Sequence, residues 1–260
     1  MMVPDTKRIL ITNDDGIHAP GLKLLEEIAR QLSDDVWVVA PEVEQSGMGH
    51  ALTLAEPLRY RKLEERRYAV RGTPTDCVMM AMHKIIEGDK PTLLLSGINR
   101  GGNLAEDMTY SGTIAAAMEG TICGIPSIAL SQEISSVNRQ TPFAVAQEFA
   151  LPVIRDILTQ SWEDGILVNV NFPPDIRNIH GIKTTQQGFR DEAELFVKER
   201  EDLRGGHYYW LGFRRAYGNP AEGTDLEAIR DGYISITPLH LDLTHYSTFN
   251  SFRKNLNKDF

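Results

Sequence analysis

One stretch near the start of the chain, Arg8 to Gly21 (RILITNDDGIHAPG), constrains the fold more than any other. It opens with an apolar, β-branched run that is typical of a buried strand. The run breaks at two adjacent acids, Asp14 and Asp15, and a helical pattern of apolar residues begins at Pro20. A strand that leads into a helix in this way favours a parallel α/β sheet, and such sheets bind their ligands at the carboxyl ends of the strands.

The acid pair has two interpretations. Adjacent carboxylates repel each other at a half-buried strand end unless something neutralises them, and a hard divalent cation bound through oxygen does so. The alternative is that the two acids cap the following helix and favour its positive end. The pair by itself favours neither interpretation, so the rest of the chain has to decide.

Size and charge narrow the class of protein. At 260 residues the chain is long enough for one large core, and its net charge of −9 argues against nucleic-acid polymers and anionic membranes as partners. The start (MMVPDTKR) lacks the apolar middle of a signal peptide, and no apolar run approaches the ~18 residues of a membrane-spanning helix. Cys77 and Cys123 fall in helical patterns, which disfavours a disulfide framework. We therefore expect a cytoplasmic protein.

Strand and helix patterns alternate through the first two thirds of the chain. Strands are predicted at residues 9–12, 36–40, 93–96, 127–131 and 166–171. Helices are predicted from about Thr75, the expected N-cap, to residue 86, and at 114–123 and 143–158. Residues 58–63 and 67–70 alternate around a charged turn and predict an excursion hairpin. The fold class is therefore α/β, with a doubly wound, mostly parallel sheet in residues 1–180.

Residues 181–260 have a different character. Residues 182–185 and 189–217 combine charged alternation with a cluster of aromatics, which is typical of a β-arm rather than of a continued sheet. A short helix (224–230), a strand (233–237) and a terminal helix (246–257) follow, so this region partly returns to the core. A two-stranded arm is marginally stable alone, and we expect a partner subunit to hold it. The alternative is a lid over its own active site.

Three loops that follow predicted strands carry oxygen ligands. They hold Asp14 and Asp15, then Ser46, then Asn99 and Asn103. A doubly wound sheet brings these strand ends to one edge, about 5 Å per strand apart. Ser46 and Asn99 are each more typical of turns when taken singly. Together, however, two carboxylates, a hydroxyl and an amide carbonyl suit Mg²⁺ or Mn²⁺ and do not suit a structural zinc site.

A fourth loop ends in Tyr110-Ser111-Gly112-Thr113 directly before a helix. Free backbone N–H groups, two hydroxyls and the positive helix end form a phosphate cradle, although an isolated motif of this kind is more often a plain helix cap. A phosphate cradle beside a metal site indicates phosphoester hydrolysis. His18 and His50, in neighbouring loops, are candidates for the leaving-group acid and are more typical of structural or exposed histidines.

A non-enzymatic, receiver-like module that binds Mg²⁺ and phosphate is the alternative function. Receivers also pair acids after their first strand. They add an aspartate at the end of a middle strand, where this chain has Ser96-Gly97-Ile98-Asn99. A dinucleotide-binding fold would place G-x-G-x-x-G where this chain has NDDGIHAPG.

Several long motifs resemble the survival protein E (SurE) family. They are ILITNDDGIHAPGL, APEVEQSGMGHALT, VRGTPTDCV, LLLSGINRGGN, YSGTIAAAMEG and GTDLEAIRDGYISITPL, in the family's order from about Ile9 to Leu239. The resemblance implies a Rossmann-like core and a C-terminal arm that is exchanged between subunits of homodimers or homotetramers. It also implies a metal-dependent nucleotidase that hydrolyses nucleoside 5′- and 3′-monophosphates, with some exopolyphosphatase activity.

The same resemblance assigns residues by motif position. One divalent ion per subunit, Mg²⁺ or Mn²⁺, is expected on four ligands: Asp14, Asp15, Ser46 and Asn99. Five residues are expected against the phosphate: Gly47, Asn103, Ser111, Gly112 and Thr113. Asp14 and Asp15 are the catalytic candidates, since either acid could orient or deprotonate the attacking water, although a metal-bound carboxylate is a weak base.

Overall fold

The computed structural model describes residues 7–135, 139–140, 142–190, 193–215 and 217–258. Its strands are β1 (Arg8–Thr12), β2 (Asp35–Pro41), β3 (Arg59–Glu64), β4 (Arg67–Arg71), β5 (Leu93–Arg100), β6 (Ser127–Gln132), β7 (Ile166–Phe172), β8 (Gly181–Thr184), β9 (Ala193–Glu201), β10 (His207–Arg215) and β11 (Tyr233–His240). Its helices are α1 (Pro20–Ala29), α2 (Pro74–Met80), α3 (Gly112–Ile122), α4 (Ala144–Leu158), α5 (Asp225–Arg230) and α6 (Tyr246–Leu256), with short turns of helix at η1 (Ala81–Ile85), η2 (Ala105–Thr109) and η3 (Ile176–Asn178).

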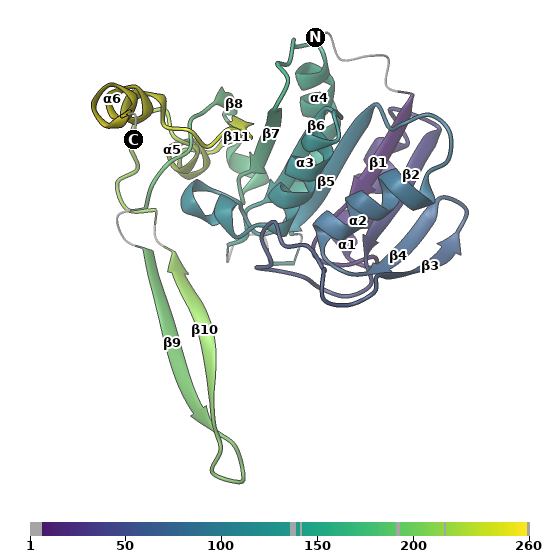
Figure 1. Ribbon diagram of the computed structural model, residues 1–260, viewed down its shortest axis with the longest axis horizontal. Coiled ribbons are helices and arrows are strands. Elements are labelled where there is room, and N and C mark those ends of the chain that lie inside the picture. The colour runs from purple at the N-terminus through teal and green to yellow at the C-terminus, as the bar shows by residue number, and fades with distance from the viewer. Residues whose placement is uncertain (1–6, 136–138, 141, 191–192, 216, 259–260) are drawn as a thin grey trace.

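A nine-stranded sheet in the order β3-β4-β2-β1-β5-β6-β7-β11-β8 forms the centre of the molecule (Figure 1). Strands β4, β2, β1, β5, β6 and β7 run parallel to one another. The order steps outward from β1 in both directions, which is the doubly wound arrangement. The predicted fold class is confirmed.

Helices cover both faces of this sheet, as the alternation of buried residues requires. In β1, Ile9 and Ile11 pack in one apolar cluster with residues of α1 and α4, whereas Leu10 packs in the other cluster with residues of α2 and α3. A strand that is buried on both faces needs a continuous apolar run, and the segment from Ile9 to Ile11 supplies it. The carboxyl ends of the parallel strands therefore meet at one edge, between the two helical layers.

Two predicted boundaries differ from the structure for identifiable local reasons. Helix α2 is capped by Thr73 instead of Thr75, because Pro74 fits the first helical position and Asp76 completes a reciprocal capping box with Thr73. Strand β5 continues beyond residue 96 to Arg100 through an irregularity in its pairing with β6. That extension carries Asn99 to the end of the strand, beside the loop that follows β1.

Two predictions about strand pairing were wrong. The hairpin β3–β4 is not an excursion, because β4 pairs in parallel with β2 and extends the sheet. Residues 182–185 are not part of the arm, because β8 pairs with β11, which itself runs antiparallel to β7. The region 181–260 thus shares the central sheet with residues 1–180.

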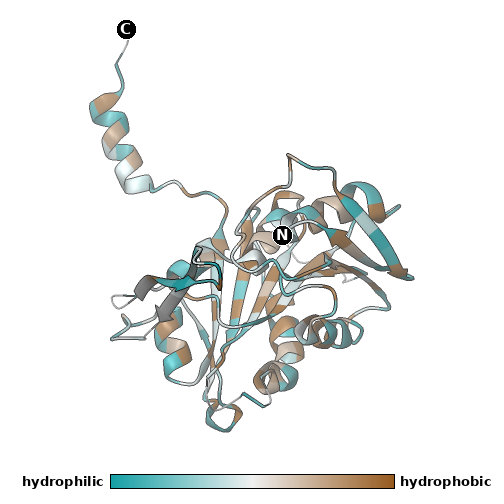
Figure 2. Ribbon diagram, turned by 90° about the horizontal axis from the view of Figure 1, so that it is seen from below, coloured by the Kyte–Doolittle hydropathy of each residue, from teal (hydrophilic) through white to brown (hydrophobic). Residues whose placement is uncertain are grey.

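The arm itself is the antiparallel pair β9–β10, in register from His207–Glu201 to Arg215–Ala193. It projects from the body of the molecule in Figure 1. Helix α6 stands clear of the body in Figure 2 and buries none of its residues. Its aromatics Tyr246, Phe249 and Phe252 are all at least 46% exposed. The predicted β-arm and terminal helix are confirmed as elements, and their role in oligomerisation stays a prediction.

None of the helices in the described part of the chain is long and apolar enough to span a membrane. The first six residues, which contribute to the expectation that the chain lacks a signal peptide, lie outside the described residues.

The buried carboxylate of Asp76 generates a stability prediction. It accepts hydrogen bonds from the Thr73 N–H (2.8 Å), the Thr53 N–H (3.0 Å) and the Thr53 hydroxyl (2.6 Å), and so ties the loop after β2 to helix α2. We expect Asp76→Ala to lower the free energy of unfolding by about 3 kcal/mol, because it leaves buried donors without an acceptor. Urea unfolding followed by circular dichroism measures this.

Asp89→Ala is the matched control, since Asp89 is exposed and its side chain has no hydrogen-bond partner among the described residues. Its expected effect is within roughly 0.5 kcal/mol. Equal stability of the two variants would contradict the assignment of Asp76 as an anchor.

Candidate metal and phosphate site

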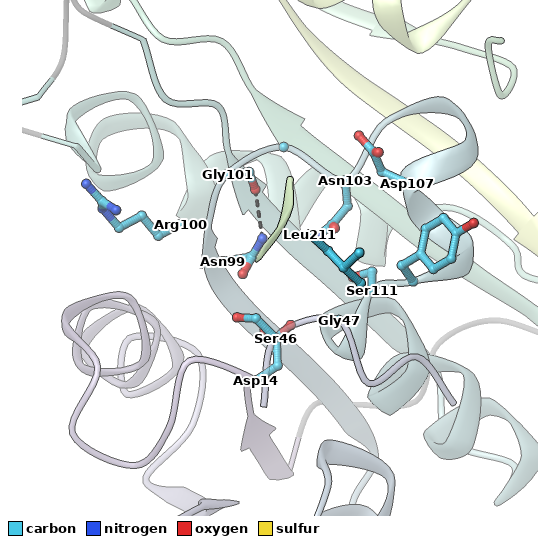
Figure 3. A pocket seen from close by; sticks show the side chains of 12 residues that line it. Asp14, Ser46, Gly47, Asn99, Arg100, Gly101, Asn103, Asp107, Ser111 and Leu211 are labelled. Carbon is cyan, nitrogen blue, oxygen red and sulfur yellow. Dashed lines mark hydrogen bonds between the residues drawn. The ribbon is translucent and has the colours of Figure 1, made fainter. Parts of the chain in front are cut away.

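A cavity of about 650 Å³ opens at the carboxyl edge of the parallel strands (Figure 3). Loops after β1, β2 and β5, the start of α3 and the arm all contribute to its wall. The lining residues are Asp14, Ser46, Gly47, Asn99, Arg100, Gly101, Gly102, Asn103, Asp107, Tyr110, Ser111 and Leu211. The structure therefore brings together six residues that the sequence predicts for the site: Asp14, Ser46, Gly47, Asn99, Asn103 and Ser111.

Asp14 is a buried carboxylate, only 4% exposed, at the end of β1. Its pKa is raised to about 6, because burial and, to a smaller extent, the neighbouring charge of Asp15 outweigh the lowering effect of the hydrogen bond from Thr113. The Thr113 hydroxyl donates to Asp14 Oδ1 at 2.6 Å. Protein donors thus compensate the charge of Asp14 only in part.

Asp15 lies beside the cavity and does not line it. Its Oδ2 accepts a hydrogen bond from the Arg100 N–H at 3.2 Å. Burial raises the pKa of Asp15, the Arg100 N–H lowers it, and the charge of Glu44 raises it again. Neither acid caps α1, whose N-cap is Ala19 with no side-chain hydrogen bond. The capping interpretation of the acid pair is therefore wrong.

Ser46 and Asn99 present oxygen atoms toward Asp14. The Asn99 amide nitrogen donates to the Gly101 carbonyl at 2.8 Å, which leaves its amide oxygen on the side of Ser46 and Asp14 (Figure 3). The Ser46 hydroxyl donates to Glu44 at 2.9 Å, and its oxygen keeps lone pairs for a further partner.

These donors fit a hard divalent cation. They combine carboxylate, hydroxyl and amide oxygens around a buried acid whose pKa is raised. Among the described residues that line the cavity, Arg100 is the one basic side chain, and it points away from Asp14 (Figure 3). A cation at this point would supply the positive charge that the surrounding side chains do not.

The start of α3 differs from the prediction in one respect. Ser111 caps the helix by accepting the Ile114 N–H at 3.1 Å, and it lines the cavity as expected. Gly112 and Thr113 do not line it. Thr113 is fully buried, and both its hydroxyl and its backbone N–H are hydrogen-bonded to Asp14. The expectation that the Thr113 hydroxyl contacts phosphate is therefore corrected: that hydroxyl holds the metal-ligand candidate Asp14.

Gly112 is required by the same close approach. A β-carbon at this position would lie 2.8 Å from Asp14 Cβ and 3.0 Å from Pro74 Cγ. Contacts below 3.0 Å are not tolerated by close-packed atoms, so a larger residue would push Asp14 away from the helix end. Gly112 thus permits the contact between β1 and α3, and does not reach the cavity itself.

Asn103 is held by a buried polar cluster that sequence analysis missed. Its backbone N–H donates to Asn171 Oδ1 at 2.8 Å, and its carbonyl accepts from Asn169 at 2.9 Å and from Asn171 at 3.1 Å. Its amide nitrogen donates to Ser131 Oγ at 2.8 Å. The sequence does carry a sign of this cluster: Asn169 and Asn171 lie at alternate positions of the otherwise apolar strand β7. Buried amides need hydrogen-bond partners, so such a pair indicates a buried polar network.

The root of the arm is attached to the same wall of the cavity. Arg190, with a side chain only 5% exposed, forms an ion pair with Asp107 at 2.8 Å and donates to the Leu104 carbonyl at 3.2 Å. Asp107 lines the cavity, as does Leu211 in β10. No local sequence pattern signals these contacts, since they join residues more than eighty positions apart.

The two histidine candidates lie outside the cavity. His50 pairs through Nε2 with Glu119 Oε2 at 3.0 Å, on helix α3. His18 is exposed and does not line the cavity either. Their placement agrees with the structural and exposed interpretations of these residues.

The fold and the site together define a doubly wound α/β protein with a cluster of oxygen donors beside a helix N-terminus. The family model of survival protein SurE matches residues 9–194, and the chain belongs to this family. The resemblance that the sequence motifs indicated is therefore confirmed.

Individual relatives cover nearly the whole chain. The protein named 5′-nucleotidase SurE from Parvibaculum lavamentivorans is 57% identical over 243 residues, which are 93% of this chain and 88% of that protein. The 5′-nucleotidase SurE from Caulobacter vibrioides is 54% identical over 95% of both chains. The crystal structure of the SurE protein from Aquifex aeolicus has a TM-score of 0.82 at 41% identity, and covers 96% of this chain and 100% of that chain.

The contact between Thr113 and Asp14 generates a prediction about metal affinity. We expect Thr113→Val to weaken Mn²⁺ binding about tenfold, because loss of a partner that orients a metal ligand has effects of this size. Isothermal titration calorimetry with Mn²⁺ measures it. Thr121→Val is the matched control, since Thr121 lies on the same helix and its hydroxyl donates to the Ala117 carbonyl. Unchanged Mn²⁺ affinity in Thr113→Val would contradict this role and favour the original assignment of the hydroxyl to phosphate binding.

Proposed function

We propose that the protein is a divalent-metal-dependent phosphomonoesterase that hydrolyses nucleoside 5′-monophosphates to nucleoside and phosphate. The observation that carries this proposal is that the buried acid Asp14, Ser46, Asn99 and the capped N-terminus of α3 meet in one cavity. Membership of the SurE family and relatives named 5′-nucleotidase at 54–57% identity support the same activity. The receiver-like alternative has no comparable support.

In this proposal Asp14, Asp15, Ser46 and Asn99 hold one divalent ion per subunit, Mg²⁺ or Mn²⁺. Asp15 would hold it through the carboxylate that accepts the Arg100 N–H at 3.2 Å. When bound, the ion lowers the pKa of a water molecule and neutralises charge on the phosphate. Asp14 or Asp15 orients the attacking water.

Phosphate oxygens are held by Ser111, Gly47 and Asn103 in this proposal. The Ser111 oxygen accepts the Ile114 N–H, so its own proton is available for a phosphate oxygen. Asn103 bonds Ser131 through its amide, and because a serine hydroxyl both donates and accepts, the amide can exchange its oxygen and nitrogen without losing that bond. The exchanged amide presents its NH₂ group to the cavity, as a phosphate requires.

We further propose that the arm and α6 contact other subunits of a homodimer or homotetramer. Support comes from exposed aromatics, among them Tyr208 and Tyr209 on β10 and Phe252 on α6. An exposed two-stranded hairpin also gains stability from a covering surface. Cytoplasmic location, hydrolysis of 3′-monophosphates and exopolyphosphatase activity stay predictions of the sequence and of the family resemblance.

Metal removal tests the proposed function directly. We expect release of phosphate from AMP to stop in excess EDTA and to return on addition of Mn²⁺ or Mg²⁺, because the site supplies no other strong positive charge. A malachite-green phosphate assay measures both steps. Phosphate release that continues unchanged in excess chelator would refute metal dependence.

The variant Asp15→Asn tests whether Asp15 binds the metal without contributing to the stability of the fold. The amide keeps the shape but removes a charge that hard cations favour, so we expect at least about a hundredfold lower kcat/KM at micromolar Mn²⁺ with an unchanged melting transition. Asp34→Asn, on an exposed aspartate, is the control. Near-normal activity of Asp15→Asn at low metal concentration would remove Asp15 from the ligand set.

A deletion that tests the subunit contact of the arm has to spare Arg190, which attaches the arm to the cavity wall. Replacing residues 198–210 with a short Gly/Ser linker keeps Arg190 on Asp107 and keeps Leu211 paired with Val197, so the residues that line the cavity are preserved. We expect a smaller oligomer in sedimentation velocity and unchanged Mn²⁺ affinity. An unchanged oligomer would contradict the subunit contact.

A further inference from the structure

The cavity has a polar side and an apolar side. Asp14, Ser46 and Asn99 form the polar side, where the proposed metal ligands lie. Leu211 lies on the other side, near Asn103 and Ser111, in Figure 3. The remaining large side chain of the apolar side is Tyr110, which is 54% exposed and directly precedes Ser111 in the chain.

An aromatic ring and an aliphatic side chain beside a phosphate site suit a flat, apolar group attached to that phosphate. Small-molecule cavities of about 300–1,000 Å³ commonly combine a few fixed polar groups with apolar walls. A nucleobase presents a π-face that stacks on aromatic side chains whatever its identity. The acid in this wall, Asp107, is already paired with Arg190 at 2.8 Å. Stacking and apolar contact are therefore what Tyr110 and Leu211 offer a base.

Leu211 is held over the cavity although it lies on a projecting arm and is 70% exposed. The first strand of the arm, β9, follows Arg190, whose buried guanidinium pairs with Asp107 in the cavity wall. The strand that carries it is followed by Tyr217, which packs against a small buried cluster with Leu104 and Ala105 of the same loop. Both roots of the arm are therefore fixed to the segment that leads to Tyr110.

We propose that the nucleobase of the substrate is held between the ring of Tyr110 and the side chain of Leu211, so that the arm completes the nucleoside site. This inference rests on the proposed nucleotidase function. It assigns the arm a role in substrate binding besides any subunit contact. It also makes recognition of the base a matter of stacking and apolar contact, which tolerates purines and pyrimidines alike.

The test compares a substrate with a base and one without. We expect Tyr110→Leu and Leu211→Ser each to raise the KM for AMP about tenfold, within the range that loss of one base contact produces. The kcat for AMP and the KM for glycerol phosphate should stay within about twofold, because the base contacts are equally strong in the ground state and the transition state.

Two control variants accompany them. Tyr110→Phe keeps the ring and should keep the KM for AMP. Leu203→Ser makes the same change as Leu211→Ser at the tip of the arm, where Leu203 is fully exposed and does not line the cavity. It should leave both substrates unaffected.

A selective loss of AMP affinity in both Tyr110→Leu and Leu211→Ser, absent from the controls, supports the proposal. An effect in only one of the two variants, an equal rise in KM for AMP and glycerol phosphate, or the same loss in Leu203→Ser overturns it. A wild-type enzyme that hydrolyses neither ester in Mn²⁺ overturns the proposed function and this inference with it. A wild-type enzyme that hydrolyses both, without a selective loss in the variants, overturns this inference alone.

Discussion

The contact between Asp14 and the start of helix α3 is the interaction on which the rest of the site depends. A carboxylate that is 4% exposed costs free energy unless positive charge or hydrogen-bond donors compensate it. Thr113 compensates it in part with its hydroxyl and backbone N–H, and Gly112 allows the close approach. Because burial still holds the pKa of Asp14 at about 6, the carboxylate retains an unmet demand for positive charge, which a divalent cation satisfies.

Around this contact the protein builds its cavity from buried polar groups that fix one another. Asn169 and Asn171 on β7 hold the backbone of Asn103 from both its N–H and its carbonyl, and Ser131 on β6 holds its side chain. Buried hydrogen bonds of this kind position a loop more rigidly than solvent-exposed contacts do. The position of Asn103 in the cavity wall is thus set by strands that lie deep in the sheet.

The same wall of the cavity also carries the attachment of the arm. Arg190 brings a buried positive charge to Asp107, and this ion pair couples the root of the arm to the segment between Asn103 and Ser111. Breaking a buried pair leaves an uncompensated charge, so the two parts are expected to move together. The arm therefore shares the ion pair that holds this wall of the cavity, although none of Asp14, Ser46 and Asn99 lies on it.

The sequence by itself determined the fold class and the edge of the sheet at which Asp14, Ser46 and Asn99 meet in one cavity. This was possible because periodic apolar runs fix strands and helices locally, and parallel strands place the loops after them at one edge. Only the tertiary structure decided that Thr113 serves Asp14, that β4 and β8 extend the sheet, and that Arg190 and Leu211 reach the cavity. Those contacts depend on distances between residues far apart in the chain, and a hydroxyl at a helix end carries no local signal of which neighbour it will bind.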